Sequence, residues 1–275
     1  MNTSESIADP HPHYARLRDG AAMHLVRRTD EPDYWLVTRY AEARAALADK
    51  RLFDDDPVPP EFRPERAEEL RPRIAEITAG LLDGFGDGGD LIEDFALPLA
   101  AAVITELAGD PGRSRPVADV IGTGMVTLFR HPPQRAALRA RPALLPAAVE
   151  ELVRFDGPLT RSAPGRATEE LTVGGTVIAK GDIVVAGLAA ANRDRRRFPE
   201  PGRLDLLRDD APHLGFGYGR RPCAVAAPAR VTAQVAIGAL MSRFRRLGPA
   251  VPLDQLDWLP DESSRSLRSL PVTTG

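Results

Sequence analysis

Prolines and glycines divide this 275-residue chain into short segments, and that division limits its fold more than any other feature. The longest apolar run, Phe95–Ile104, contains Pro98, and no run approaches the roughly 18 apolar residues that cross a membrane. Regular structure is predicted to break at the proline- and acid-rich residues 54–60, at Gly109–Gly112 and at His131–Pro133. We therefore expect a series of short elements without a membrane span.

The pattern of apolar residues predicts a mainly α-helical fold with small β-sheets. Helices are predicted over Pro12–Leu17, Tyr40–Ala48, Arg66–Leu82, Leu91–Leu107, Pro116–Phe129, Leu144–Phe155 and from Ala224 to about Arg245. Strands are predicted over Met23–Arg28, Tyr34–Thr38, the hairpin Leu171–Ile178, Asp182–Ala186 and Leu267–Val272. No internal repeat is present, so we expect residues 1–275 to form a single domain.

Composition and charge exclude several classes of protein. The chain has 36 basic and 39 acidic residues, a net charge of −3, so it is not a bulk polycation for nucleic acid. Residues Met1–Pro10 lack the apolar stretch of a secretory signal. The single cysteine excludes an internal disulfide framework and a four-cysteine zinc site. We therefore expect a cytoplasmic protein that binds neither nucleic acid nor membranes.

The one cysteine lies between a glycine-rich loop and a long predicted helix. The loop reads Phe-Gly-Tyr-Gly-Arg-Arg-Pro-Cys over residues 216–223. The helix dipole, free backbone N–H groups and the side chains of Arg220 and Arg221 are expected to favour a thiolate at Cys223. A thiolate is a soft ligand that binds iron well. The alternative interpretation is a buried structural cysteine beside an ordinary turn, and the loop alone leaves both open.

The spacing of this loop resembles the heme-binding loop of the cytochrome P450 family. Phe216, Gly219 and Cys223 match the family pattern Phe-x-x-Gly-x-x-x-Cys. The strand region from Gly165 to Gly181 is also similar, and the resemblance runs almost continuously from Pro116 to Val272. It implies a cytochrome P450-like fold and heme as the cofactor.

A Glu-x-x-Arg motif upstream adds to this resemblance. Glu151 and Arg154 match the family's helix motif, and Arg203 lies where the family places the arginine that completes a Glu–Arg–Arg network. The spacing alone is weak, because Glu68 to Arg71 and Glu200 to Arg203 show it as well. Such pairs are usually surface salt bridges of a helix.

The resemblance implies a role for each matched residue. Cys223 would be the axial thiolate on heme iron, and Phe216 would shield the sulfur from water. Arg221 and Arg166 would pair with the heme propionates, since a guanidinium group suits carboxylate geometry. Glu151, Arg154 and Arg203 would form a structural network behind the heme and would not touch the substrate.

The chain also departs from the family, mainly by being shorter. The segment after Phe53 that normally closes over the heme, with a further propionate-binding basic residue, is missing. Residues 109–117 replace the helices that form the roof of the substrate pocket and the first half of the distal helix. The family's acid–threonine pair for proton delivery has no match. Val225 replaces a glycine near the porphyrin and Pro228 follows it, and we expect both to weaken heme binding.

These features leave two main hypotheses. The first is a heme-thiolate oxidoreductase of the monooxygenase type, supplied with electrons by a ferredoxin-type partner or driven by peroxide. The second is a non-catalytic member of the same fold, such as a protein that stabilises a sugar transferase in secondary metabolism. The shortening favours this alternative if it leaves apolar helix faces uncovered for a partner. A decayed gene product that folds poorly is a third, less informative interpretation.

Overall fold

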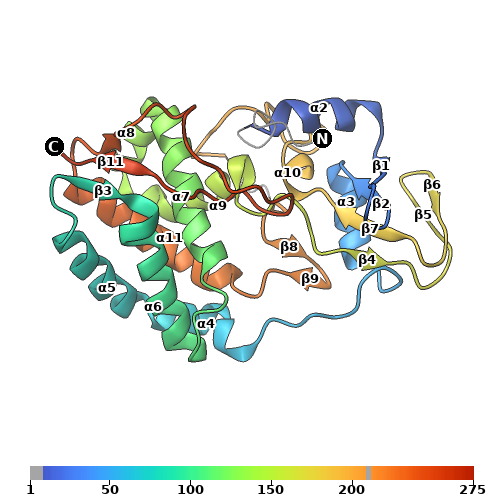
Figure 1. The fold of residues 1–275 in the computed structure, drawn as a ribbon, viewed down its shortest axis with the longest axis horizontal. Helices are drawn as coiled ribbons and strands as arrows, with labels where there is room; N and C mark the ends of the chain where they lie inside the picture. Colours follow the sequence, from blue (N-terminus) through green and yellow to red (C-terminus); the bar gives the residue numbers. More distant parts are fainter. Residues whose placement is uncertain (1–8, 209–211) are drawn as a thin grey trace.

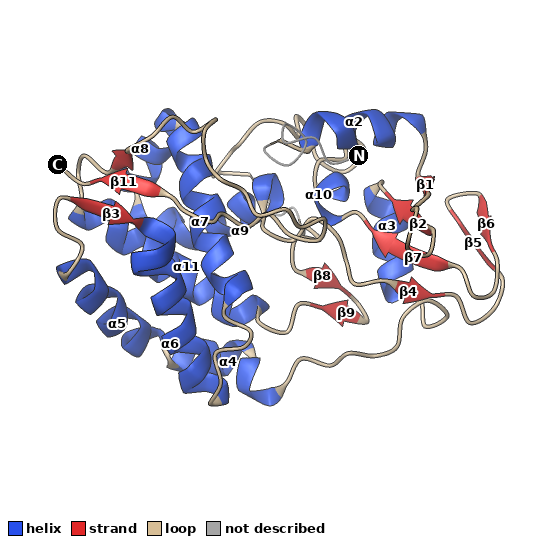
Figure 2. Cartoon of the chain, in the orientation of Figure 1, coloured by secondary structure: helices blue, strands red, loops and turns tan. Residues whose placement is uncertain are grey.

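Most of the helices lie on one side of the molecule, together with β3 and β11, and the other strands lie on the opposite side with α2, α3 and α10 (Figures 1 and 2). The structure is a computed structural model that describes residues 9–208 and 212–275. The helices of the described residues are α2 (His11–Gly20), α3 (Tyr40–Ala48), α4 (Pro64–Glu69), α5 (Arg71–Asp83), α6 (Leu97–Ala108), α7 (Arg115–Arg130), α8 (Pro132–Ala140), α9 (Leu145–Asp156), α10 (Leu188–Ala191) and α11 (Ala226–Arg243). Three short turns of other helical types are η1 (Pro60–Phe62), η2 (Leu91–Ala96) and η3 (Pro142–Leu144).

The strands form four small sheets. The largest contains β1 (Met23–Val26), β2 (Tyr34–Val37), β7 (Ile183–Ala186) and β4 (Gly165–Arg166), in the order β1-β2-β7-β4. A second sheet contains β10 (Gly248–Pro249), β11 (Pro271–Thr273) and β3 (Gly88–Asp90). The two remaining sheets are hairpins, one of β5 (Leu171–Val173) and β6 (Thr176–Ile178), the other of β8 (Gly217–Tyr218) and β9 (Arg221–Pro222). The mainly α-helical prediction with small sheets is confirmed.

Prolines divide two of the predicted helices. The segment Arg66–Leu82 breaks at Leu70 into α4 and α5, because Pro72 would remove a hydrogen bond from a continuous helix and clash with its preceding turn. The segment predicted from Leu91 begins as the π-turn η2, and α6 starts one residue before Pro98. Pro98 is tolerated in the first turn of α6, because the backbone N–H groups of a helix's first turn have no partner within the helix.

The predicted strand Leu267–Val272 is mostly wrong, because only Pro271 and Val272 belong to β11. The preceding residues bond elsewhere: the backbone N–H of Arg268 donates to the carbonyl oxygen of Asp257. The backbone N–H of Leu270 donates to the carboxylate of Asp90 at 3.0 Å. These bonds hold the segment against two different parts of the chain and leave no continuous ladder.

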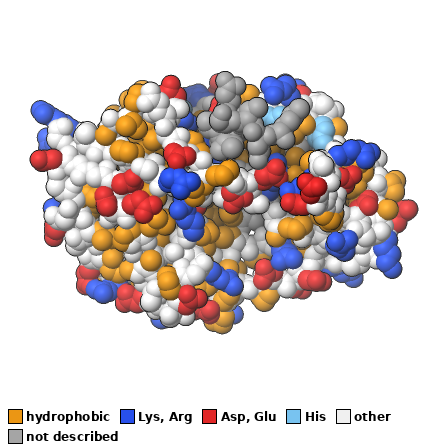
Figure 3. Space-filling view, viewed as in Figure 1, with side chains coloured by type: hydrophobic (Ala, Val, Ile, Leu, Met, Phe, Trp, Pro, Cys, Tyr) orange, Lys and Arg blue, Asp and Glu red, His pale blue; other side chains and the backbone are white. Residues whose placement is uncertain are grey.

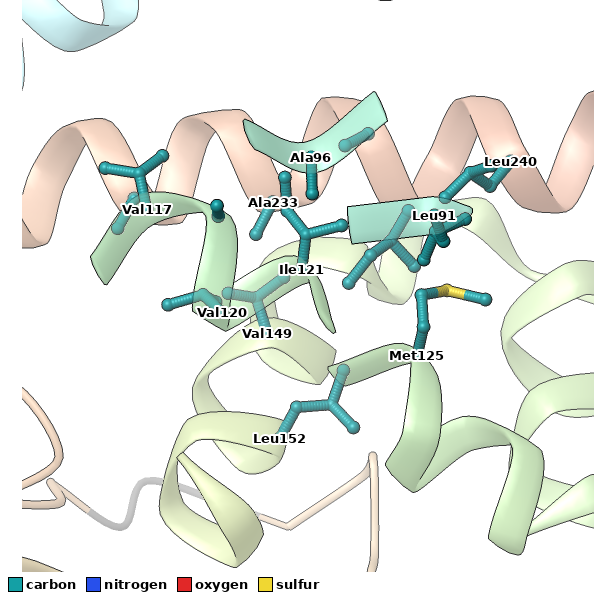
Figure 4. Close-up of a cluster of buried hydrophobic side chains, with 14 of the residues drawn as sticks. Leu91, Ala96, Val117, Val120, Ile121, Met125, Val149, Leu152, Ala233 and Leu240 are labelled. Carbon is teal, nitrogen blue, oxygen red and sulfur yellow. The ribbon is translucent and has the colours of Figure 1, made fainter. Parts of the chain in front are cut away.

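Helix α7 is enclosed in the main core. Every residue from Val117 to Phe129 is buried, and α11, α9, α6 and η2 pack around the helix (Figure 4). The exposed large hydrophobic side chains of the described residues are Leu25, Val177 and Leu207, which lie on separate segments. The uncovered apolar helix faces that the shortened sequence led us to expect are therefore not found among the described residues.

A second core lies beneath the largest sheet. It contains Val37 of β2, Leu47 of α3, Val184 of β7 and Phe53, which follows α3. The parallel pairing of β2 with β7 joins the N-terminal hairpin to the middle of the chain. Figure 3 shows acidic and basic side chains interspersed over the visible face. No helix in the described part of the chain is long and apolar enough to cross a membrane.

Candidate functional site

A tight hairpin positions the cysteine at the start of α11. Gly217 has φ of 73°, and a Cβ there would lie 2.0 Å from the carbonyl oxygen of Arg221, so no other residue fits. Gly219 has φ of 61° and packs against α3, where a Cβ would lie 3.0 Å from the Cα of Ala48. The backbone N–H of Cys223 donates to the carbonyl oxygen of Phe216 at 2.7 Å. The glycines thus fix the direction in which the sulfur leaves the loop.

The electrostatics at Cys223 differ from the sequence-based expectation. Burial raises the pKa of the thiol, although a hydrogen bond from the backbone N–H of Val225 and the charges of Arg230 and Arg113 act in the opposite direction. Arg113 belongs to the loop between α6 and α7, so this shortened connection lies within electrostatic reach of the sulfur. Without a metal, burial outweighs these effects and the thiol form is favoured.

The two arginines of the loop do not stabilise a thiolate. Arg220 forms an ion pair with Asp55, and Arg221 pairs with Asp56 at 3.3 Å. Both carboxylates lie in the extended segment after Phe53, whose backbone also bonds the loop through the N–H of Asp56. The expectation that Arg220 and Arg221 lower the pKa of the thiol is therefore wrong, because their charges are directed to these aspartates.

The side chain of Phe216 is buried beside the loop. The guanidinium carbon of Arg230 lies 4.4 Å from the centre of its ring. Glu150 holds Arg230 in this position by two hydrogen bonds of 2.7 and 3.0 Å. The Nε2–H of His213 donates to the same carboxylate at 3.1 Å, while Nδ1 accepts from the backbone N–H of Gly215. Phe216, Arg230 and Glu150 thus pack together on one side of the cysteine loop.

Arg166 and Arg221 line the same cavity. It has a volume of about 540 Å³, and its walls come from Lys50, residues 52–54, 164–168 and 180–181, together with Arg221. Arg166 donates to the carbonyl oxygen of Gly181 at 2.8 Å. The Nε of Arg221 is buried and has no hydrogen-bond partner among the described residues. The structure thus brings together the two arginines that the resemblance assigned to the heme propionates.

Glu151 and Arg154 form a buried ion pair on α9. The guanidinium group of Arg154 donates to both carboxylate oxygens of Glu151, at 2.6 and 2.8 Å. It also donates to the carbonyl oxygens of Asn192, Pro201 and Arg203, at 2.9, 3.1 and 3.4 Å. The Glu-x-x-Arg matches at Glu68–Arg71 and Glu200–Arg203 are exposed pairs, whereas the side chains of Glu151 and Arg154 are 4% and 1% exposed. This pair therefore ties α9 to the coil that leads to the cysteine loop.

Arg203 does not complete the network with its side chain. Its guanidinium group is exposed and pairs with Glu200 at 3.2 Å, and only its carbonyl oxygen meets Arg154. Arg208 takes the place expected for Arg203, because its Nε reaches Glu151 at 3.3 Å and its side chain is 13% exposed. Arg208 was not predicted to contact Glu151. The only sign of it in the sequence is a second arginine, five residues after Arg203 in the same coil.

The N-terminal turn of α7 carries a buried acid in place of the acid–threonine pair. Arg115 and the hydroxyl of Ser266 donate to the carboxylate of Asp119, at 2.9 and 2.6 Å. Burial raises the pKa of Asp119 to about 6, and these two donors only partly offset the rise. The hydroxyl of Thr123 donates a hydrogen bond to the backbone carbonyl oxygen of Asp119, not to its carboxylate.

Comparisons with known proteins agree with this arrangement. The sequence pattern of the cytochrome P450 family matches residues 126–257. The cytochrome P450 monooxygenase PikC of Streptomyces venezuelae is 32% identical over 378 residues, covering 96% of this chain and 91% of its own. The vitamin D(3) 25-hydroxylase of Pseudonocardia autotrophica is 31% identical, covering 97% of this chain and 94% of its own. Both alignments are longer than this chain, so each relative has segments with no counterpart here.

This chain belongs to the cytochrome P450 family. The structure of the P450 monooxygenase TamI with tirandamycin C superposes with a TM-score of 0.92 at 28% identity, covering 100% of this chain and 99% of the other. The P450 fold is therefore retained, although this chain is shorter than its relatives. Heme iron is the cofactor of the family.

The residues present fit a heme group. Cys223 supplies the soft sulfur ligand, and the described residues contain no cluster of three or more His, Cys, Asp or Glu side chains that would hold a metal instead. The unpartnered Nε of Arg221 and the cationic cavity suit the carboxylates of the porphyrin. Val225, which replaces a glycine of the family pattern, has its side chain buried in the main core. Pro228 is the third residue of α11, where its missing N–H costs little.

Arg154 and Arg203 each follow a glutamate by three residues, but replacing them should lower the free energy of unfolding by very different amounts. Arg154→Ala leaves Glu151 as an unpaired buried charge, so we expect the free energy of unfolding to fall by about 3–5 kcal/mol. Arg203→Ala removes only an exposed pair and should change it by less than about 0.5 kcal/mol. Urea denaturation of both variants measures the difference, and equal effects would contradict the assignment.

Asp119 should make stability depend on pH. Its pKa in the folded state is raised to about 6, so its stabilising contribution is complete below about pH 4 and is lost as the pH rises through 6. Asp119→Asn cannot titrate. Relative to the wild type, its free energy of unfolding should therefore rise by about 2 kcal/mol between pH 4 and 7. Asp257→Asn, at an exposed ion pair, is the control. Parallel pH curves for wild type and Asp119→Asn would refute the raised pKa.

Proposed function

We propose that this protein binds heme through Cys223 and acts as a heme-thiolate oxidoreductase of the cytochrome P450 monooxygenase type. The observation that carries this proposal is the placement of the sulfur. Gly217, which no other residue can replace, and Gly219, which has a left-handed φ of 61°, direct it towards the start of α11, where the backbone N–H of Val225 bonds it. Membership of the family supports the same function.

The protein's own residues would prepare the site as follows. Because burial favours the thiol, Cys223 would have to lose its proton to solvent in order to hold a metal as a thiolate. The N–H of Val225 and the charges of Arg230 and Arg113 then stabilise the thiolate. Arg166 and Arg221 hold the porphyrin carboxylates. Heme, when bound, supplies the redox-active iron at which oxygen chemistry takes place.

The substrate and the electron donor follow from the family. The relatives include PikC, pentalenic acid synthase and 6-deoxyerythronolide B hydroxylase, so we propose a substrate from secondary metabolism. We propose a ferredoxin-type protein as the electron donor. The residues that would enclose the substrate are reduced to the loop between α6 and α7, which runs from Gly109 to Ser114.

The non-catalytic alternative is favoured by the start of α7. The helix begins at Arg115, and its first turn contains Pro116 but no acid–threonine pair. Proton delivery is a usual requirement for oxygen activation, so its loss favours a binding role. The closed core opposes this alternative, because among the described residues the shortening exposes no continuous apolar face for a partner.

Cys223 should control the spectrum of the heme-loaded protein. We expect the reduced carbon monoxide complex to show the red-shifted Soret band of the family, because the thiolate is the axial ligand. Cys223→Ala should abolish this band while the far-ultraviolet circular dichroism stays unchanged. A red-shifted band in Cys223→Ala would contradict the assignment, and a colourless wild type after reconstitution would support the non-catalytic alternative.

Catalysis with oxygen should be poorly coupled. If the six-residue loop between α6 and α7 replaces the roof of the substrate pocket, the site should be open to water and should not hold a substrate in a reactive position. Both effects would lower the rate. We therefore expect little hydroxylated product per electron consumed with a ferredoxin system, and most electrons should appear as peroxide. Activity driven by added hydrogen peroxide should persist. Tight coupling with any of several hydrophobic substrates would contradict this prediction.

A further inference from the structure

The only two lysines of the chain line the cavity that contains Arg166 and Arg221. All of the other 34 basic residues are arginines. Lys50 follows α3, and Lys180 lies in the turn between β6 and β7, 130 residues further along the sequence. The fold brings both side chains to one space of about 540 Å³. Its walls include residues of β9, β4 and the extended segment that follows α3, and these elements lie near one another in Figure 1.

The neighbouring carboxylates are occupied by other donors. Asp49 pairs with Arg51 at 2.7 Å, and Glu169 lies 3.8 Å from the same guanidinium group. Asp182 accepts hydrogen bonds from the indole N–H of Trp35 and the backbone N–H of Ala179, at 3.1 and 3.0 Å. Neither lysine forms an ion pair with a carboxylate of the described residues. Many surface arginines, in contrast, have an acidic partner.

The cavity therefore carries an excess of positive charge. Its walls contain Arg166, Arg221 and both lysines but only one carboxylate, that of Asp54. Arg221 is paired with Asp56, so the excess comes from Arg166 and the two lysines. Arg166 donates only to a carbonyl oxygen, which leaves its charge uncompensated. A ligand with two carboxylates would complement this set of charges.

Arg221 connects the cavity to the cysteine loop, because it borders the cavity and precedes Cys223 by two residues. Two residues span at most about 7 Å of chain, so the cavity begins a short stretch of chain away from the cysteine. A porphyrin carries its carboxylates at the edge of the ring, several bonds from the metal. This arrangement suits a porphyrin whose metal lies at Cys223 and whose edge reaches the lysines.

We propose that Lys50 and Lys180 bind the two propionate carboxylates of heme together with Arg166 and Arg221. The inference rests on the proposed heme-binding function. The shortened segment after Phe53 lacks the basic residue with which relatives close over the heme, and the lysines supply positive charge from two other parts of the chain. A lysine ammonium group on a flexible stem can reach a carboxylate without the fixed geometry that a guanidinium group requires.

Chemical labelling of amines tests this proposal without measuring activity. The full chain would be treated with an acetylating reagent with and without bound hemin, and the peptides containing Lys50 and Lys180 quantified by mass spectrometry. We expect hemin to slow the modification of both lysines several-fold. The N-terminal amine is the internal control and should react at an unchanged rate. Equal labelling rates of the lysines with and without hemin would overturn the proposal.

Binding measurements with matched variants give a second test. The double variant Lys50→Gln and Lys180→Gln should bind hemin about tenfold more weakly than the wild type, as two lost exposed ion pairs would predict. Its affinity for hemin dimethyl ester, which lacks the carboxylate charges, should not change. The control is Arg245→Gln and Arg246→Gln, which removes the same charge from the exposed loop between α11 and β10.

The outcomes separate this inference from the function on which it rests. Hemin affinity of the lysine variant equal to that of the control would overturn the role of the lysines but leave heme binding through Cys223 intact. Protection of both lysines by hemin without the thiolate spectrum would support their role but contradict Cys223 as the ligand. Failure of the wild type to bind hemin would overturn both.

Discussion

A buried arginine on α9 holds the coil from which the cysteine loop is built. Arg154 pairs with Glu151 and donates to three backbone carbonyl oxygens of residues 192–203. One of these belongs to Asn192, whose side-chain oxygen accepts a hydrogen bond from the backbone N–H of Leu214 at 2.7 Å. Leu214 in turn accepts from Gly217 in the hairpin. Irregular coil thus gains a fixed position, because a guanidinium group can satisfy several carbonyl oxygens at once.

The position of Cys223 combines two opposing effects. Burial in the loop disfavours a charged sulfur, while a backbone N–H and two arginines partly compensate. In a metal-binding protein this balance couples ligand binding to proton release, because the ligand must be a thiolate. A buried thiol is also less reactive toward oxidants than an exposed thiolate. The same surroundings therefore protect the sulfur in the absence of a metal and support its charge once a metal is bound.

The shortening of the chain has not opened its core. Helix α7 is surrounded by α11, α9, α6 and η2, and the C-terminal segment reaches it through Ser266 and Leu267, which meet Asp119 and Arg115. Such a core can form without a roof because each helix buries its own apolar side chains against these neighbours. The connection between α6 and α7 is only Gly109–Ser114, and the charge of Arg113 within it acts on the thiol of Cys223.

The sequence by itself determined the features that depend on local contacts. Helix α3 matches its predicted bounds, the Gly174–Gly175 hairpin forms as expected, and the spacing of Phe216, Gly219 and Cys223 identified the loop. These features were predictable because caps, turns and apolar periodicity act within a few residues. Only the tertiary structure decided that Arg208 rather than Arg203 contacts Glu151, and that two lysines 130 residues apart share one cavity. It also decided that Arg220 and Arg221 pair with aspartates and leave the thiol to the effect of burial. Ion pairs and burial depend on which distant segments meet, and in a chain with 34 arginines the spacing of residues does not identify the partner.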